Sequence, residues 1–353
     1  MNPLPSSVSA LSSNELAALF KTLGEPAFRA TQLLEFFYRK GVSSYDEVTN
    51  LSLALREKLK LVAPLYALSL VARSAGDETV KWLWRAADGA QFESVQIEAP
   101  DRMTSCLSSQ VGCAMGCVFC ATGLSGFERH LRAHEILEQY LQMRSQSGTH
   151  SSHVVFMGMG EPLHNYDEVL VAARKLNAPP PQGAGIGARR ITISTVGIVP
   201  GIRRLADENL QLELAISLHA PDEEIRRKLI PTANCYSIRE ILAAAEEYFK
   251  RTHRLVTYEY TLLAEVNDSP EQARCLARLL QTHPCKVNLI PFNPVSEIGF
   301  KQSELNAQER FKRILDEARI PTTIRFSKGR QVDAACGQLR RRVLAADGVS
   351  STQ

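Results

Sequence analysis

Apolar residues near the N-terminus recur at the spacing of amphipathic helices. Ser12 and Glu15 have the spacing of a capping box at the start of the first predicted helix. Two further helices are predicted over about residues 28–41 and 44–61. This pattern predicts a small helical domain over residues 1–65, whose first ten residues lack the pattern and are expected to form a disordered tail.

The pattern changes to short strands after about residue 65. Residues 79–99 read as two strands joined in a hairpin, with Asp88-Gly89 at the turn. We therefore assign residues 66–105 to a β-hairpin region that links the helical domain to the core.

Apolar runs in the remainder of the chain alternate with segments of helical spacing. The predicted strands cover residues 153–159, 189–197, 212–219, 255–263, 286–293 and 322–327. Residues with N-cap spacing open the helices between them: Asn165, Ser237, Ser269 and Asn306. Repeated β–α units indicate a parallel sheet with functional groups at the carboxyl ends of its strands. About six units are too few for a closed eight-stranded barrel, so we expect an α/β fold with a partial (β/α)6 barrel over residues 106–342 and a disordered tail over residues 343–353.

The composition is that of an ordinary globular enzyme, with 353 residues, 44% of them hydrophobic and 22% charged. No apolar run is long enough to span a membrane, and the N-terminus lacks the features of a signal peptide. We therefore expect a cytoplasmic protein without membrane association, whose cysteines stay reduced. The net charge of +3 is too small to indicate a nucleic-acid partner, but residues 324–342 carry six basic side chains against one acidic one. That stretch suits either a phosphate-binding strip or a solvated basic tail.

Four of the eight cysteines fall within residues 106–120. Cys113, Cys117 and Cys120 have the spacing C-x3-C-x2-C, and Cys106 lies seven residues upstream of the first. A structural zinc site takes four protein ligands, usually from two separate C-x2-C pairs, and the sequence has no second pair. Three thiolates at this spacing suit three irons of a [4Fe–4S] cluster, with the fourth iron open to another ligand. On spacing alone, we favour the cluster over zinc.

Short polar residues follow three of the predicted strands. Gly160 and Glu161 lie in the run GMGEP, where glycines permit close backbone approach and the carboxylate suits an ammonium group; a simple turn fits equally well. Ser194 ends the next strand and residues 217–219 end the one after. Polar groups at these positions suit a ligand carboxylate and a ribose, although His219 alone is more typical of a buried core histidine.

Six motifs connect these features to a known family. The C-x3-C-x2-C spacing followed by β–α units resembles the radical S-adenosylmethionine (SAM) superfamily. The following motifs occur in the order seen in the RlmN/Cfr family of 23S rRNA adenine-C2/C8 methyltransferases: CLSSQVGCAMGCVFCATG, FMGMGEPLHN, ITISTVGIVP, AISLHAP, VNLIPFNP and DAACGQL. The resemblance extends from about Gly24 to Leu339 and implies a radical SAM partial barrel preceded by an RNA-binding accessory domain.

The resemblance assigns roles to residues that the pattern leaves open. It implies that three cysteines ligate one [4Fe–4S] cluster per chain: Cys113, Cys117 and Cys120. It implies that SAM is bound by Gly160, Glu161, Ser194, Ser217, Leu218, His219 and Asn293. Cys336, which would otherwise read as a buried and inert cysteine, is implied to carry the methyl group, with Cys106 as the second catalytic cysteine and Glu93 as the proton acceptor. The remaining cysteines match nothing catalytic and are expected to be structural: Cys235, Cys275 and Cys285.

The implied reaction methylates a ring carbon of adenine in RNA and uses two SAM molecules per turnover. Cys336 receives a methyl group whose carbon then joins the adenine, and attack by Cys106 on the sulfur of Cys336 releases the product and leaves a disulfide. We expect methylation at C2 of a 23S rRNA adenosine in the peptidyl-transferase region and at C2 of adenosine 37 in tRNAs. Cfr-type methylation at C8 of the same rRNA base is the alternative, because GEP is closer to RlmN while ITISTVGIVP and TIRFSKG are closer to Cfr.

The resemblance also implies partners: 23S rRNA, tRNA, an electron donor such as flavodoxin or ferredoxin, and a thiol reductant. We expect a monomer. Two other function classes stay open from the residues alone. A radical SAM enzyme with a different substrate would need neither Cys106 nor Cys336, and a zinc-stabilised RNA-binding module would carry no catalysis.

Overall fold

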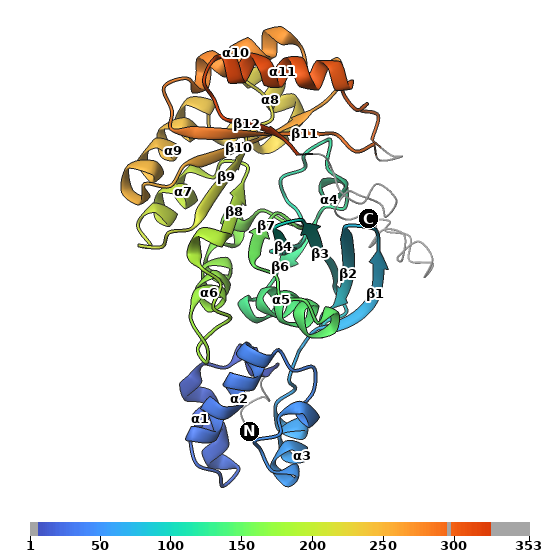
Figure 1. Cartoon of the computed structure of the whole chain (residues 1–353), viewed down its shortest axis with the longest axis vertical. Coiled ribbons are helices and arrows are strands. Elements are labelled where there is room, and N and C mark those ends of the chain that lie inside the picture. Colours follow the sequence, from blue (N-terminus) through green and yellow to red (C-terminus); the bar gives the residue numbers. More distant parts are fainter. Residues whose placement is uncertain (1–5, 295–297, 326–353) are drawn as a thin grey trace.

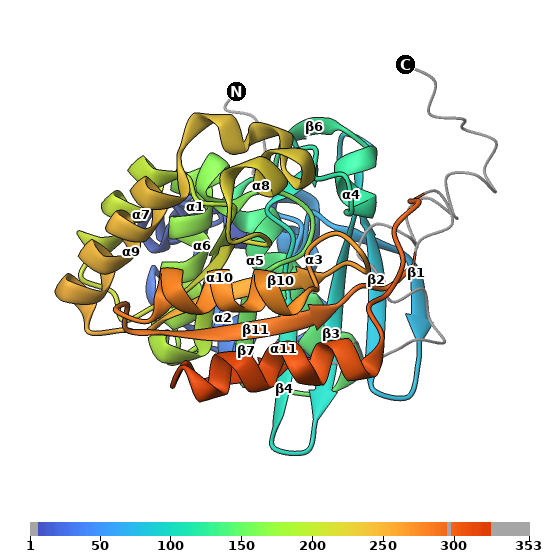
Figure 2. The same ribbon diagram turned by 90° about the horizontal axis from the view of Figure 1, so that it is seen from above.

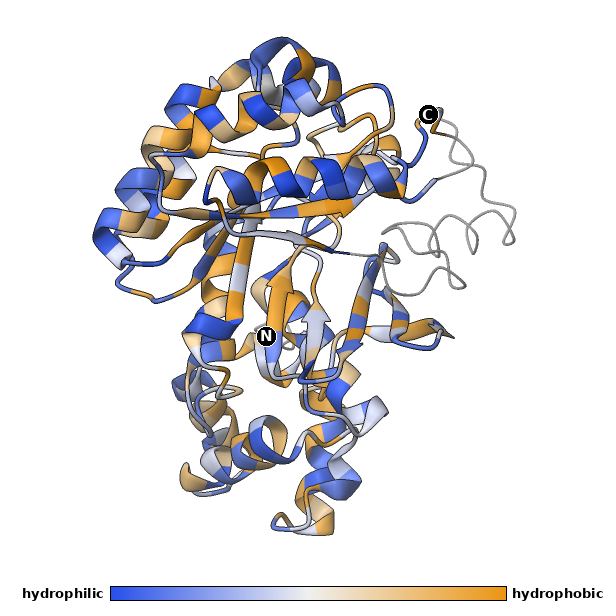
Figure 3. Ribbon diagram, turned by 45° about the horizontal axis from the view of Figure 1, so that its top comes forward, coloured by the Kyte–Doolittle hydropathy of each residue, from blue (hydrophilic) through white to orange (hydrophobic). Residues whose placement is uncertain are grey.

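The structure, a computed structural model, describes residues 6–294 and 298–325. A helical lobe formed by N-terminal residues lies at one end of the long axis, and one large sheet with its helices forms the rest (Figure 1). The strands inside carry many apolar positions, whereas the helices around them alternate between apolar and polar ones (Figure 3). Within the described ranges, no helix has both the length and the apolar character needed to cross a bilayer.

The N-terminal lobe is built from α1 (Ser13–Thr22), α2 (Phe28–Leu34) and α3 (Leu53–Val62). The predicted capping box opens α1, since Ser12 N–H donates to Glu15 Oε2 at 2.8 Å and Glu15 N–H donates to Ser12 Oγ at 3.2 Å. The third helix starts later than expected because Tyr45–Glu47 forms a separate 3-10 turn. All three predicted helices are therefore present, one with a shifted boundary.

The expectation of a disordered tail over residues 1–10 is wrong for residues 7–10. Val8–Ala10 forms a 3-10 turn, and Val8, which is 1% exposed, donates its N–H to Pro64 O at 2.9 Å. Ser9 Oγ donates to Glu138 Oε1 at 2.6 Å. One apolar anchor and one paired hydroxyl order this segment, which is too short to show a helical period in the sequence.

A single ten-stranded sheet has the order β1-β2-β3-β4-β7-β8-β9-β10-β11-β12. Its strands are β1 (Ser69–Ala75), β2 (Thr79–Arg85), β3 (Gln91–Ala99), β4 (Arg102–Cys106), β7 (His153–Phe156), β8 (Ile191–Thr195), β9 (Glu213–Ser217), β10 (Val256–Leu262), β11 (Cys285–Pro291) and β12 (Thr322–Ile324). Strands β1–β4 pair antiparallel, with the predicted hairpin between β2 and β3. From β4 onward every neighbouring pair is parallel, as the β–α alternation predicts.

Helices connect the parallel strands. They are α5 (Ala133–Ser147), α6 (Tyr166–Asn177), α7 (Val199–Ala206), α8 (Glu223–Leu229), α9 (Ile238–Thr252), α10 (Pro270–Leu280) and α11 (Leu305–Glu317). Ser237 and Ser269 cap α9 and α10 with their hydroxyls, as predicted. Asn165 precedes α6 but its amide does not cap it, and the N-cap predicted at Asn306 is wrong because Glu304 holds that position.

The sheet forms an open arc and not a closed barrel. Figure 1 shows the strands following one another from β1 to β12, with α6, α7, α9 and α10 along the outer side of the arc. The view from above shows α10 and α11 alongside β10 and β11 (Figure 2). In the described strand order, β1 and β12 stand at opposite ends and do not pair with each other. The predicted α/β partial barrel is confirmed, and β1–β3 extend its sheet.

Helix α5 fastens the N-terminal lobe to the core. Glu138, which is fully buried, accepts hydrogen bonds from Ser9 Oγ and from the N–H groups of Ala67 and Leu68 at 2.6, 2.7 and 2.9 Å. Burial raises the pKa of Glu138 to about 7, against the opposing effect of these bonds. Arg144, two turns further along, donates to Tyr38 O at 2.7 Å. Helix α5 therefore binds both the segment around Ser9 and the connection to the sheet.

We predict that Glu138→Ala destabilises the protein by about 3 kcal/mol, because it leaves the buried N–H groups of Ala67 and Leu68 without an acceptor. Urea unfolding measures this change. Gln146→Ala on the same helix, at an exposed position, is the matched control and should change stability by less than about 0.5 kcal/mol. Equal stability of the two variants would contradict the role of Glu138 as the anchor.

Candidate active site

A cavity of about 220 Å³ lies at the carboxyl ends of the parallel strands β7, β8 and β9. The predicted site residues that line it are Cys113, Cys117, Cys120, Gly160, Glu161, Ser194, Ser217 and His219. They come from separate parts of the sequence and meet because parallel strands place their carboxyl ends at one edge of the sheet.

The three cysteines lie in a loop between β5 (Gln110–Gly112) and α4 (Ala121–Leu124). Strand β5 pairs with β6 (Phe127–His130), which follows α4. This pairing holds together the residues before the loop and the residues after α4. Gly112 has a φ of 74°, and a Cβ there would lie 1.9 Å from Gly126 O, so only glycine fits. Cys113 N–H donates to Gly126 O at 2.7 Å, which fixes the start of the loop.

The thiols of Cys113 and Cys117 are neutral when they carry no metal. Burial raises the pKa of Cys113 to about 12 and raises that of Cys117 as well. Metal binding deprotonates such thiols, so the charge of a bound cluster would create the thiolates. No three acidic, histidine or cysteine side chains in the described ranges converge on one metal position. A tetrahedral zinc ion needs such convergence, whereas a [4Fe–4S] cluster takes each thiolate on a different iron, so three thiols around one cavity suit the cluster.

Glu161 forms a buried acidic wall of the cavity. It is 2% exposed, and its two carboxylate oxygens accept the N–H groups of Leu163 at 3.0 Å and Val196 at 2.8 Å. Burial raises its pKa to about 7. No salt bridge to Glu161 forms among the residues that the structure describes, so a cationic ligand would supply the missing charge partner. Gly160 next to it has a φ of 105°, and a Cβ there would lie 2.6 Å from Gln110 Cβ.

His219 is both a core histidine and a cavity residue. It is 6% exposed and has a φ of 58°, and its Nδ1 accepts the N–H of Thr261 at 3.0 Å. Burial lowers its pKa to about 3, so the ring is neutral and carries its proton on Nε2. Its ring packs edge-on against Phe119 of the cysteine loop, with centroids 4.9 Å apart. The structure therefore joins the end of β9 to the cysteine loop.

Two of the predicted SAM contacts do not line this cavity. Leu218 is fully buried, and its N–H donates to Glu259 O at 3.1 Å. Asn293 follows the end of β11 and is partly exposed at the same edge of the sheet. Ser194 and Ser217 do line the cavity, at the ends of β8 and β9.

Glu93 and Cys106 lie behind one wall of the cavity. Cys106 ends β4 opposite Val95 of β3, and Glu93 lies two residues before Val95, so both side chains project from the same face of the sheet. Both are buried, at 2% and 5% exposure. Cys106, Val95 and Val155 form a small apolar cluster, and Met157, which lines the cavity, packs against this cluster. The thiol therefore belongs to a cluster that borders a cavity residue.

Cys336 lies outside the described residues. The described chain ends at Arg325, whose N–H donates to Leu289 O at 2.7 Å and whose Nη1 lies 3.9 Å from Met157 Sδ. The last residue of the described range is therefore beside the same methionine that packs against the cluster containing Cys106.

Two buried charged residues near the cavity were not predicted from the sequence. Glu259 lines the cavity at 3% exposure; its Oε1 accepts from Asn288 Nδ2 at 3.0 Å and its Oε2 has no hydrogen-bond partner. Burial raises its pKa. Arg226 is 1% exposed. Glu259 is the single charged residue in the otherwise uncharged strand sequence VTYEYTLL. This pattern could have identified it from the sequence, because charged residues are rarely buried unless they are paired or functional.

The fold and this cavity are those of the radical SAM superfamily, whose family model matches residues 107–274. A second model, described as the ribosomal RNA large subunit methyltransferase N-terminal domain, matches residues 8–65. The solved structure of a radical SAM methyltransferase from Sphaerobacter thermophilus is 42% identical, with a TM-score of 0.89, and covers 95% of this chain and 99% of that one.

Curated relatives agree along nearly the whole length. A probable dual-specificity RNA methyltransferase RlmN 2 of Protochlamydia amoebophila is 48% identical over 330 residues, 92% of either chain. A probable dual-specificity RNA methyltransferase RlmN of Symbiobacterium thermophilum is 48% identical over 345 residues, 96% of this chain and 91% of the relative. The chain belongs to the RlmN family of radical SAM methyltransferases. Membership implies a [4Fe–4S] cluster and SAM, makes the chain a SAM-dependent transferase, and excludes the non-catalytic zinc module.

We predict that Gly160→Ala destabilises the protein by about 3 kcal/mol, since the new methyl group meets Gln110 and an L residue is strained at this φ. Gly187→Ala is the matched control, because a Cβ there meets nothing within 4 Å and should cost less than about 0.5 kcal/mol. Urea unfolding compares the two variants. A Gly160→Ala protein as stable as the control would mean that the backbone does not approach Gln110 closely.

Proposed function

We propose that this chain methylates C2 of an adenosine of 23S rRNA in the peptidyl-transferase region and C2 of adenosine 37 in tRNAs. The observation that carries the proposal is the identity of 48% to relatives named dual-specificity RNA methyltransferases over more than nine tenths of the chain. The match of residues 8–65 to a ribosomal RNA methyltransferase domain supports an RNA substrate. The proposal extends to a cytoplasmic monomer that works with an electron donor such as flavodoxin or ferredoxin and a thiol reductant.

The cavity residues have binding roles in this proposal. Three thiols hold one cluster: Cys113, Cys117 and Cys120. Glu161, in its charged form, binds the ammonium group of SAM, and the neutral ring of His219 donates from Nε2. Ser194 and Ser217 offer hydroxyls to the ribose and carboxylate, and Gly160 admits the ligand close to the backbone, with Leu218 and Asn293 completing the set. When bound, the cluster and two SAM molecules per turnover supply the methyl group and the one-electron chemistry that an unreactive ring carbon requires.

The remaining steps belong to the protein's own side chains. Cys336 carries the methyl group, which would give up one hydrogen atom to the one-electron chemistry that bound SAM supplies, so that its carbon forms the bond to the adenine ring. Glu93 accepts the proton that the ring carbon loses, and the accompanying electron would return to the bound cofactors. The Cys106 thiolate then attacks the sulfur of Cys336, and the sulfur–carbon bond breaks with its electron pair on the carbon, which takes up a proton to complete the methyl group. The methylated adenosine leaves, and a Cys106–Cys336 disulfide remains for the thiol reductant.

The position of Arg325 supports these roles for Cys336 and Cys106. Its Nη1 lies beside Met157, which packs against the apolar cluster that contains Cys106. Cys336 follows Arg325 by eleven positions, a length that spans up to about 36 Å when extended. Cys336 is therefore within reach of both the cavity and Cys106.

We predict that purified protein loaded with iron and sulfide converts unmodified rRNA and tRNA to products containing 2-methyladenosine, measured by mass spectrometry of digested RNA. Cys117→Ala should give no product because one iron loses its only protein ligand. Cys275→Ala, on α10 and outside the cavity lining, should keep the wild-type yield. Detection of 8-methyladenosine alone would assign the chain to C8 methylation, and an active cluster without any methyladenosine would mean a different substrate.

We predict that substitutions of the two catalytic cysteines block the reaction at different steps. Cys336→Ala has no sulfur to methylate and should form no covalent species with RNA. Cys106→Ala can still join Cys336 to the base but lacks the thiol that breaks the link, so it should accumulate a protein–RNA adduct. That adduct should survive denaturant and reducing agent, because its link is a thioether. A denaturing gel with labelled RNA tests this; a shifted band from Cys336→Ala, or none from Cys106→Ala, would refute the assignment.

A further inference from the structure

Arg226 on α8 is a fully buried cation. It is 1% exposed, and long charged side chains are rarely buried to this extent without a charged partner. Among the residues that the structure describes, Arg226 forms no salt bridge. Its Nη2 donates to the carbonyl oxygen of Val196, and its Nε is buried without a hydrogen-bond partner. The arrangement keeps a guanidinium charge inside the protein with only one neutral acceptor.

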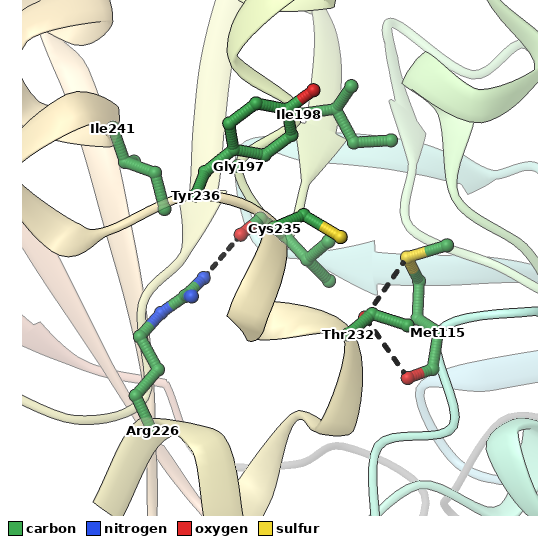
Figure 4. Close-up of a pocket in the computed structure, with 9 residues that line it drawn as sticks. Met115, Gly197, Ile198, Arg226, Thr232, Cys235, Tyr236 and Ile241 are labelled. Atoms are coloured by element: carbon green, nitrogen blue, oxygen red, sulfur yellow. Dashed lines mark hydrogen bonds between the residues drawn. The ribbon is translucent and has the colours of Figure 1, made fainter. Parts of the chain in front are cut away.

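The charge lies directly behind the wall of the active-site cavity. Arg226 borders a second cavity of about 220 Å³, an apolar pocket that shares Met115 and Val196 with the first. The guanidinium of Arg226 donates to the carbonyl oxygen of Val196. Figure 4 shows Arg226 on one side of this pocket and the hydroxyl of Thr232 bonded to Met115 on the other. Met115 lies between Cys113 and Cys117, so the pocket borders the cysteine loop from behind.

Two connections run from α8 to the reactive groups. Arg226 holds the carbonyl of Val196, and the N–H of the same residue donates to Glu161 Oε2 at 2.8 Å. At the other end of the helix, Leu229 O accepts the N–H of Val118 in the cysteine loop at 3.1 Å. Helix α8 therefore contacts both the residue that binds Glu161 and the cysteine loop.

A buried charge with no ion pair is unfavourable by itself, so an apolar side chain of similar length would fill this place at lower cost. The cost is offset if the neighbouring centre is anionic. Three thiolates on a cluster make such a centre, and its negative charge grows by one unit on reduction. A fixed positive charge nearby stabilises the reduced form more than the oxidised form, and the reduction potential rises.

We propose that Arg226 is a positioning residue that raises the reduction potential of the cluster held by Cys113, Cys117 and Cys120. It acts through its buried charge on the cysteine loop, while its bond to the carbonyl of Val196 holds the residue whose N–H binds Glu161. This inference rests on the proposed function, because it requires that the three cysteines hold a cluster.

The test is a redox titration of the cluster-loaded protein without RNA, followed by electron paramagnetic resonance of the reduced form. Arg226→Met removes the charge and keeps the length of the side chain. The ratio of reduced to oxidised cluster at a fixed potential should fall at least tenfold, which is 59 mV for one electron. Arg227→Met is the matched control: it removes the adjacent charge on the same helix at an exposed position, where solvent screens it, and should change the ratio less than twofold.

Arg226→Lys tests whether the charge of Arg226 or the shape of its guanidinium affects the potential. This variant provides the test if Arg226→Met does not assemble a cluster. The lysine variant keeps the charge but cannot reproduce the guanidinium geometry, so a ratio within threefold of the wild type is expected. A tenfold loss in Arg226→Lys, or an unchanged potential in Arg226→Met, would overturn the inference. Failure of the proposed function looks different: a protein without a cluster would bind no iron and sulfide even as wild type, and a protein with another substrate or product would give the expected titration but no 2-methyladenosine.

Discussion

The pairing of β4 with its two neighbours determines where Cys106, the cysteine loop and Glu161 lie. β4 is antiparallel to β3 and parallel to β7, so Cys106 at its end stands opposite Val95 on one side and Val155 on the other. Because β4 and β7 run in the same direction, the cysteine loop that follows β4 and the segment Gly158–Glu161 that follows β7 emerge at one edge. The hydrogen bond from Ser109 N–H to Met159 O, at 2.9 Å, holds the two segments together.

The cavity is electrostatically incomplete without its ligands. Glu161 and Glu259 are buried carboxylates that form no salt bridge in the described residues, and burial raises the pKa of each, although the charges of Arg325 and Lys286 oppose the rise at Glu259. Buried charges of this kind are tolerated where function requires them, because a ligand of opposite charge restores the balance. SAM carries a positive sulfonium and an ammonium group, and would supply positive charge to these carboxylates.

Local features of this fold could be predicted from the sequence, and long-range ones could not. Ser237 and Ser269 could be predicted as helix N-caps because each capping hydroxyl accepts the N–H of a residue only three positions later. Asn165 has the same spacing, but its amide donates to Ser109 O and Leu131 O, both at 2.8 Å, which no local pattern reveals. β4 escaped prediction since its residues are mostly polar and its strand exists through pairing with β3 and β7. The cavity residues were found through motifs, whereas Arg226 and Glu259 carry no motif and are recognised only by their burial.

Helix α5 connects the N-terminal lobe to the cavity through its two faces. On one face, Glu138 binds the segment after the lobe, as the bonds to Ala67 and Leu68 show. On the other, Gln139 receives the N–H of Ser108 at 2.8 Å and donates to its carbonyl at 2.9 Å. The hydroxyl of Ser108 in turn donates to Glu93 O and accepts the N–H of Met159. Neighbouring residues of one helix therefore link the lobe, whose residues 8–65 match the ribosomal RNA large subunit methyltransferase N-terminal domain, to the strands that lead to the cavity.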